Sequence, residues 1–183
     1  MKRVMIIGCS GSGKSTLARD LGEIKKLPVI HIDKMYWKSG WVLRSIEEVI
    51  PMVEAVAKTD QWVFDGNNTS SFGCRISRAD TLIFLDFPTY LCMSRVIWRV
   101  IKYKMGQART DMADGCPERF DWEFVKFLKW IYDYKKRGGW QSAMKLHDEA
   151  PAHIDKYHLC NKKAVDDFLE KANSNYDDSN RNY

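Results

Sequence analysis

Gly8-Cys9-Ser10-Gly11-Ser12-Gly13-Lys14-Ser15 is the stretch of sequence that decides the fold. It fits the pattern G-x-x-x-x-G-K-[ST] at every specified position, and a plain glycine turn is the alternative interpretation. Glycines in this pattern let backbone N–H groups turn inward around phosphate oxygens, and the N-terminus of a following helix adds partial positive charge. Lys14 would then reach the β- and γ-phosphates, and the Ser15 hydroxyl would bind Mg2+. The residues expected to bind the nucleotide here are Gly8, Ser10, Gly11, Ser12, Gly13, Lys14, Ser15 and Thr16.

The sequence on both sides of this loop predicts a strand before it and a helix after it. Residues 3–8 form a short apolar run that ends in glycine, which is typical of a buried parallel strand. Leu17, Leu21 and Ile24 then recur at helical spacing, and the pattern stops before Leu27 and Pro28. This strand, loop and helix are the context that a phosphate-binding loop requires.

Further apolar runs at 29–33, 61–65, 81–86 and 153–160 predict four more strands. Between them lie helical patterns. One opens with the capping box Ser45-x-x-Glu48 and contains Pro51, which should kink or shorten it. The others are expected at 90–104, 121–136 and 163–172. Strands that alternate with helices predict an α/β fold with a doubly wound parallel sheet, whose ligands bind beyond the carboxyl ends of the strands.

Three aspartates end predicted strands at the same sheet edge as the glycine-rich loop. Asp86 stands where a carboxylate would hold Mg2+ through its water shell, and helix capping is its alternative role. Asp33 and the turn at 65–67 should border the acceptor side of the cleft. Asp33 would take the proton of an acceptor hydroxyl, or would only position an acceptor whose phosphate oxygen is already ionised.

Length and composition predict one domain. The chain has 183 residues, of which 45% are hydrophobic and 29% charged. We expect a single domain at 1–172, a lid insertion at about 105–120, and a disordered polar tail at 173–183. Five scattered cysteines without a C-x-x-C pair disfavour a disulfide framework and a zinc site. The apolar runs are too short to span a bilayer, so we expect a cytoplasmic protein with no membrane partner.

The charge of the chain is mildly basic. A net charge of +5 suits an anionic ligand but is too small to indicate nucleic-acid binding by itself. Much of the excess lies within 95–109, where a solvated helix face is the alternative interpretation. Nucleic acid is therefore a possible partner that no helix-turn-helix or zinc-finger motif supports.

Several segments outside the loop carry a resemblance to one family. They are HIDKMYWKSGW at 31–41, WVFDGN at 62–67, ADTLIFLDFP at 79–88 and DMADGCPERFDWEF at 111–124. With GCSGSGKST they resemble the DNA topology modulation proteins related to FlaR, a group of adenylate kinase-like P-loop kinases. The resemblance covers about residues 1–172. It implies a three-layer P-loop NTPase with a five-stranded parallel sheet, helices on both faces and a helical lid, which uses ATP and Mg2+.

The resemblance also implies roles for arginines. In the helix after the strand-ending Asp, the family has one arginine against the adenine and another, four residues later, at the phosphates. Those positions match Arg95 and Arg99. Arg109 in the lid and Arg137 after the next helix would clamp the moving phosphoryl group, because charge spreads over its oxygens. The expected catalytic residues are Lys14, Asp33, Arg99 and Arg137, and Arg95, Arg99 and Arg109 would also bind the nucleotide.

One family feature is missing. The Gly-Phe/Tyr-Pro-Arg turn that binds AMP in adenylate kinases is replaced by Asp-Gly-Asn-Asn-Thr at 65–69. The aromatic residues Tyr36, Trp37 and Trp41 suggest a different acceptor pocket, and packing against the acceptor-side helices is the alternative interpretation. The residues expected to bind the acceptor are Asp33, Trp37, Asp65 and Asn67.

The function that these features favour is transfer of the ATP γ-phosphoryl group to a small-molecule or nucleotide acceptor. The sequence leaves two alternatives to the kinase function: a nucleotide-regulated, DNA-associated protein that affects DNA topology, and a simple P-loop ATPase. A closing lid disfavours the ATPase, because lids exclude water. The pattern leaves open ATP or GTP as donor, and a monomer or a homodimer as the assembly.

Overall fold

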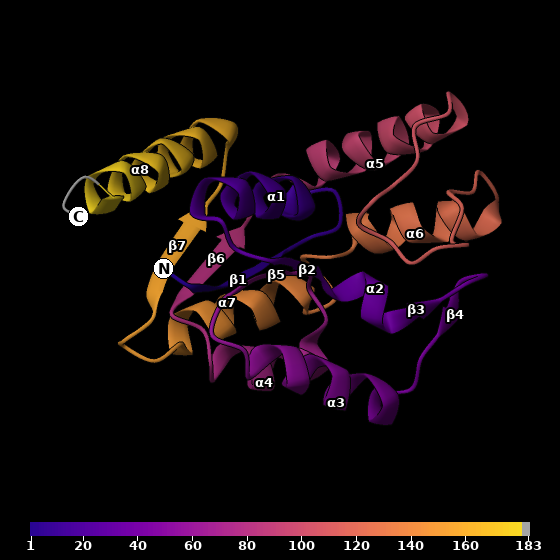
Figure 1. Ribbon diagram of the computed structural model, residues 1–183. Helices are drawn as coiled ribbons and strands as arrows, with labels where there is room; N and C mark the ends of the chain where they lie inside the picture. The colour runs from indigo at the N-terminus through magenta and orange to yellow at the C-terminus, as the bar shows by residue number, and fades with distance from the viewer. Residues whose placement is uncertain (181–183) are drawn as a thin grey trace.

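A five-stranded parallel sheet forms the middle layer of the computed structural model, which describes residues 1–180 and the side chains of 1–174 (Figure 1). The strand order is β2-β5-β1-β6-β7. The strands are β1 (Arg3–Gly8), β2 (Val29–His31), β5 (Trp62–Asp65), β6 (Thr81–Leu85) and β7 (Asp155–Leu159). Because all neighbouring strands are parallel, their carboxyl ends share one edge, and the loop after β1 lies in the middle of it.

Alternate side chains of β1 supply two separate cores. Val4 and Ile6 point to one face of the sheet, and Met5 and Ile7 point to the other. All four side chains are fully buried. Burying a side chain of this size stabilises the fold by about 1.5–3 kcal/mol, so the apolar run that predicts the strand also fastens both helical layers to the sheet.

Helices cover both faces, as the fold class predicts (Figure 1). The face that carries Val4 and Ile6 packs against α1 (Lys14–Lys25), α5 (Thr89–Lys104), α6 (Trp122–Tyr132) and α8 (Lys162–Asn180). The face that carries Met5 and Ile7 packs against α2 (Ile32–Tyr36), α3 (Ile46–Ala57), α4 (Phe72–Ile76) and α7 (Gly139–Glu149). A short 3-10 helix, η1 (Thr69–Ser71), precedes α4.

Two smaller pieces stand beyond the carboxyl edge of the sheet. The first is an antiparallel hairpin of β3 (Trp37–Lys38) and β4 (Val42–Leu43). The second is the segment 105–121 between α5 and α6, which we call the lid. The lid has no helix or strand of its own, so the helices of this region are the flanking α5 and α6.

The structure differs from the sequence-based expectation in several elements. The strand expected at 29–33 ends at His31, and α2 begins at the next residue. The helix that contains Pro51 continues to Ala57. The helix α8 continues to Asn180, where the sequence predicted a disordered tail from 173, and residues 181–183 lie outside the described part. None of the helices within 1–180 combines the length and hydropathy that crossing a membrane requires.

Candidate active site

The loop between β1 and α1 adopts a conformation that only glycine permits at two positions. Gly8 has φ +146° and Gly11 has φ +81°. A Cβ at Gly8 would collide with the backbone oxygen of Leu85, and one at Gly11 with that of Cys92. Glycine therefore lets the loop lie directly against β6 and α5. The buried hydroxyl of Ser12 in this loop has no hydrogen-bond partner among the described residues, so the loop presents a free polar atom.

A cavity of about 680 Å³ opens over this loop and the first turn of α1. Its floor is the loop from Ser10 to Leu17, and its other walls come from α5, the lid and the beginning of α8. Lys14 lines the cavity, and its Nζ donates to the carbonyl of Cys9 at 2.8 Å. A lysine and a helix N-terminus in one cavity form a site for an anion such as a polyphosphate.

Arg95 supports the loop from α5. Its Nη1 donates to the carbonyl of Ser12 at 3.0 Å, and its guanidinium carbon lies 4.6 Å from the centre of the Phe87 ring. Arg95 also lines the cavity. The position that the family resemblance gives to an adenine-facing arginine therefore lies at the cavity wall, where its charge also fixes the loop backbone.

A cluster of four charged residues connects α5 to the lid. Glu118, with 5% of its side chain exposed, pairs with Arg99 Nε at 2.7 Å and with Arg109 Nη1 at 2.8 Å. Arg109 Nε also pairs with Asp111 at 2.9 Å. Burial alone would raise the pKa of Asp111, but hydrogen bonds with Arg109 and Ser15 outweigh it and hold that pKa well below its usual value. Glu118 and Asp111 were not among the predicted site residues, because the lid that carries them has no regular structure from which the sequence could place their side chains.

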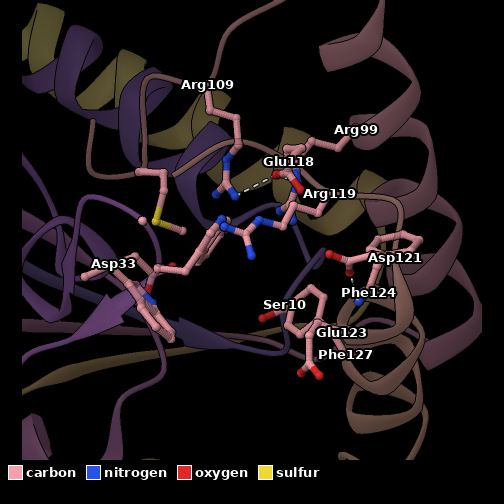
Figure 2. Close-up of a pocket in the computed structure, with 14 residues that line it drawn as sticks. Ser10, Asp33, Arg99, Arg109, Glu118, Arg119, Asp121, Glu123, Phe124 and Phe127 are labelled. Atoms are coloured by element: carbon pink, nitrogen blue, oxygen red, sulfur yellow. Dashed lines mark hydrogen bonds and ion pairs between the residues drawn. The ribbon is translucent and has the colours of Figure 1, made fainter. Parts of the chain in front are cut away.

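A second cavity of about 510 Å³ adjoins the first. It lies between the lid, the loop of the β3–β4 hairpin, α2 and the start of α6, and Figure 2 shows Arg109, Glu118 and Arg119 close together on its lid side. Its aromatic residues are Trp37, Trp41, Phe124 and Phe127. Ser10, Asp33, Arg99 and Arg109 line both cavities. The two spaces therefore meet at one loop residue, one carboxylate and two arginines.

Asp33 stands in the first turn of α2 at the junction of the two cavities. Its side chain is open to the cavity space, and among the described side chains none forms an ion pair or hydrogen bond with its carboxylate. The surrounding protein removes water from the carboxylate and raises its pKa, while the nearby Lys14 acts in the opposite direction. Such an unpaired carboxylate is well suited to accept a proton.

Asp65 and Asn67 hold the loop. Asp65 is buried and accepts a hydrogen bond from His31 Nδ1 at 2.7 Å, and it reaches only the first cavity. Asn67 accepts from the backbone N–H of Gly8 at 3.3 Å and donates to the hydroxyl of Tyr134 at 3.2 Å. Neither residue lines the second cavity, whereas Trp37 does.

Two predicted residues face away from both cavities. Asp86 accepts from Trp140 Nε1 at 2.9 Å, pairs with Lys135 at 2.9 Å and lies 3.3 Å from His158 Nε2. Arg137 pairs with Asp133 at 3.4 Å, and 59% of its side chain is exposed. Neither lines a cavity with the loop. The structure thus brings Lys14, Ser15, Asp33, Arg95, Arg99 and Arg109 together, and leaves Asp86 and Arg137 apart from them.

The lid is fastened to the hairpin by three hydrogen bonds. The N–H of Gly40 donates to the carbonyl of Gly115 at 2.8 Å, and Trp41 Nε1 donates to that of Pro117 at 2.9 Å. The third runs from Cys116 Sγ to the carbonyl of Lys38 at 3.2 Å. We call these three contacts the latch. Two residues of the latch, Gly40 and Trp41, also line the second cavity.

Comparison with known proteins rests on structure, because no family model and no curated protein matches the sequence. A shikimate kinase from Acinetobacter baumannii in complex with shikimate matches with a TM-score of 0.59 and 13% identity, over 93% of this chain and 90% of that one. A gluconokinase from Sinorhizobium meliloti 1021 matches with a TM-score of 0.50 and 13% identity, over 99% and 94%. The chain shares the fold of these two kinases. At this identity the likeness concerns the fold alone, and the residues of a P-loop kinase site must be argued from this chain's own geometry.

Proposed function

We propose that this chain is a phosphotransferase that moves the γ-phosphoryl group of ATP to the hydroxyl of a small molecule. The observation that carries the proposal is the junction of the two cavities, where Asp33, Arg99 and Arg109 face both spaces. A donor in the first cavity and an acceptor in the second would meet at these residues. Kinase names among the structural neighbours agree with this activity class.

The first cavity fits the triphosphate of a nucleotide. Backbone N–H groups of the loop, the partnerless Ser12 hydroxyl and Lys14 are all donors at its floor. Arg95, Arg99 and Arg109 add positive charge along its wall. When bound, ATP with Mg2+ supplies the phosphoryl group and a metal that offsets its charge.

The metal would lie at Ser15. The predicted partner Asp86 is held by Trp140 and Lys135, outside the cavity. The carboxylate in contact with Ser15 is instead Asp111 of the lid. The role of Asp86 as the carboxylate that holds Mg2+ therefore stays a sequence-based prediction. Asp111 is a second candidate for that role.

The residues at the junction can carry out the transfer. A new P–O bond forms to the acceptor oxygen, the bond from the γ-phosphorus to the bridging oxygen of ADP breaks, and the acceptor proton passes to Asp33. Lys14 and the two arginines oppose the negative charge that spreads over the moving group. The latched lid excludes water, which would otherwise compete with the acceptor.

A DNA-associated function and a simple ATPase are weaker candidates. The resemblance to DNA topology modulation proteins is a sequence-based expectation, and no matching family model or curated protein supports it. A simple ATPase needs no second cavity. Cytoplasmic location, magnesium use and the oligomeric state likewise stay predictions.

The proposal is tested by a screen for ADP release that depends on an added acceptor. Nucleosides, nucleoside monophosphates and small hydroxyl compounds are offered with ATP and Mg2+. We expect at least one hydroxyl compound to raise ADP release, and Lys14→Ala to abolish this rise while the thermal melt changes little, because Lys14 meets charge that develops during the reaction. Lys58→Ala, an exposed change at the end of α3, is the control. ADP release that no acceptor stimulates, or that Lys14→Ala leaves intact, would contradict the proposal.

A further inference from the structure

We infer that the second cavity selects a small hydroxyl compound that carries an anionic group, and that Arg119 binds this group. The inference rests on the proposed function and adds to it the chemical class of the acceptor. It depends on which charges in the cavity already have partners within the protein and which do not.

Two of the three arginines that line this cavity already form ion pairs within the protein. Arg99 and Arg109 both pair with the buried carboxylate of Glu118. Arg109 is held a second time by Asp111, through Nε and Nη2. Their charge is therefore largely offset within the protein, and both side chains are fixed at the boundary with the first cavity. They are placed to serve the phosphoryl group rather than a distant part of the acceptor.

Two further carboxylates of this cavity, besides Glu118, also have partners within the protein. Asp121 caps α6 by accepting the N–H of Phe124 at 3.0 Å. Glu123 pairs with Lys126 at 2.6 Å on the exposed surface. These groups contribute little free negative charge to the cavity, because a cap and an ion pair already stabilise them.

Arg119 and Asp33 are the charged groups that remain. Among the side chains of 1–174, none forms an ion pair or hydrogen bond with either of them. Figure 2 shows Arg119 extending from the lid into the cavity space, with Asp33 on the opposite side. A guanidinium presents five N–H donors in a planar fork that matches a carboxylate or a phosphate. The cavity thus offers a proton acceptor at the donor end and an anion receptor at the lid.

The walls of the cavity define the body of the acceptor. The Trp37 and Trp41 rings lie 5.4 Å apart in an edge-to-face arrangement, and Phe124 and Phe127 complete the apolar lining. Such surfaces bury the apolar face of a ring or a short carbon chain. A volume of about 510 Å³ lies within the range of small-molecule sites. Arg119 is exposed, so water hydrates its guanidinium when no anion is bound. A cationic acceptor would be repelled by Arg119, and a neutral one would gain no charge-assisted hydrogen bond from it.

The test compares pairs of probes that differ in charge but little in shape. Shikimate with its methyl ester and gluconate with sorbitol test a carboxylate, ribose 5-phosphate with ribose tests a phosphate, and glucosamine tests a cation. Binding is measured by calorimetry in the presence of a non-hydrolysable ATP analogue, so the result does not require turnover. We expect the anionic member of at least one pair to bind about 10- to 100-fold more tightly than its neutral counterpart, because a charge-assisted hydrogen bond contributes that much.

Variants of Arg119 identify the receptor. Arg119→Met should remove the preference for the anionic probe, and Arg119→Lys should keep part of it, because lysine keeps the charge but loses the fork. Lys104→Met removes an exposed cation at the end of α5 that lines neither cavity, and should leave the preference unchanged. If Arg119→Met removes the preference in the shikimate or gluconate pair, the anionic group is a carboxylate. If it removes the preference in the ribose 5-phosphate pair, the group is a phosphate.

Failure of this inference is distinguishable from failure of the kinase proposal. Acceptor-dependent ADP release with only neutral or cationic compounds would leave the kinase standing and overturn the anion receptor. An anion preference that survives in Arg119→Met would do the same. Binding of the ATP analogue with no preference in any probe pair would also overturn the inference. Tight, Arg119-dependent binding of an anionic probe without any phosphoryl transfer would sustain the receptor and contradict the kinase.

Discussion

Asp33 is a carboxylate kept without a counterion beside a phosphate-binding loop. Its pKa is raised by loss of water, so the folded protein binds its proton more tightly than the unfolded chain does. By linkage, the stability associated with this group is present at low pH and is lost as pH rises through the raised pKa. A raised pKa at a residue that lines both cavities agrees with the role of proton acceptor proposed for Asp33.

Replacing Asp33 by Asn keeps the shape and removes the proton acceptor. For transfer to a hydroxyl, we expect kcat to fall about 100- to 10,000-fold, which is the usual contribution of a general base. The parent should lose activity as pH falls through a pKa above the ordinary value for aspartate, and the variant should lack this acid limb. The thermal melt of the variant at neutral pH should equal or exceed that of the parent. Rate measurements across pH and a thermal melt test these expectations.

Asp60→Asn, an exposed turn residue before β5, is the matched control and should change neither measurement. If Asp33→Asn keeps the parent's kcat and its KM for the acceptor, Asp33 has only a structural role at the start of α2. The junction of the two cavities would then not be the site of phosphoryl transfer. If only the affinity for the acceptor falls, the acceptor is a phosphate oxygen that is already ionised, and no base is needed.

Sequence could identify the residues whose role depends on their neighbours in the chain. The loop from Gly8 to Thr16 and Asp33, which follows a predicted strand and lies in the first turn of α2, are of this kind. Glu118 and Arg119 are not, because their meaning depends on which charges the fold brings beside them. Glu118 meets two arginines, whereas Arg119, the next residue, meets no partner among the described side chains. The metal-binding role of Asp86 stays a prediction: its position after a strand fits a metal site, and in the structure Trp140 and Lys135 contact its carboxylate.

At the scale of elements, apolar patterns predicted the strands of the sheet and the helices that pack on them with long apolar faces. The helix α7 was not predicted, because it begins at Gly139 directly after Gly138 and buries only Ala143 fully. The sequence predicts the end of a strand at residues 32–33, where the structure has the start of α2. A buried apolar residue such as Ile32 is compatible with a strand and with a helix, so the pattern does not distinguish them. The two-residue strands of the hairpin are too short for any periodicity and depend on pairing with each other.

The latch between the hairpin and the lid predicts how two short elements cooperate. Trp41 adopts φ +63°, a left-handed conformation that costs a non-glycine residue about 1–2 kcal/mol. Its indole N–H donates to Pro117 across the latch, which helps to offset that cost. Trp41→Phe keeps an aromatic wall and removes the donor. We expect KM for the acceptor to rise about 2- to 10-fold, because a neutral hydrogen bond contributes about 0.5–1.5 kcal/mol, with a small change in the thermal melt.

A second variant tests the same contact from the lid. Gly115 has φ +73°, and a Cβ there would collide with Ser39 of the hairpin, so Gly115→Ala should weaken the latch more than Trp41→Phe does. Trp98→Phe, on the exposed face of α5, is the control and should leave KM unchanged. Equal KM values in all three variants would mean that the latch has no part in holding the acceptor.

At the scale of the whole molecule, the sheet and its two helical layers form a rigid base, and the hairpin and lid close over its carboxyl edge (Figure 1). In the base, β6 is buried along its whole length and β1 is buried from Val4 to Gly8. The lid has neither regular structure nor a core of its own, and is held by the latch and by the ion pair of Glu118 with Arg99 of α5. Elements held by so few contacts open at low free-energy cost, so they are the parts that binding should order.

Because the latch joins the lid to the hairpin, we expect them to close as one body. Hydrogen exchange should slow together at 37–41 and 106–118 when a non-hydrolysable ATP analogue and an acceptor are both bound, while the strands of the sheet show little change. In Gly115→Ala the two segments should lose this common response, because the latch no longer transmits the binding of one ligand to the other segment. If the hairpin responds only to acceptor and the lid only to nucleotide in the parent protein, the two move independently. The latch would then be a static contact, and the two cavities would close by separate motions.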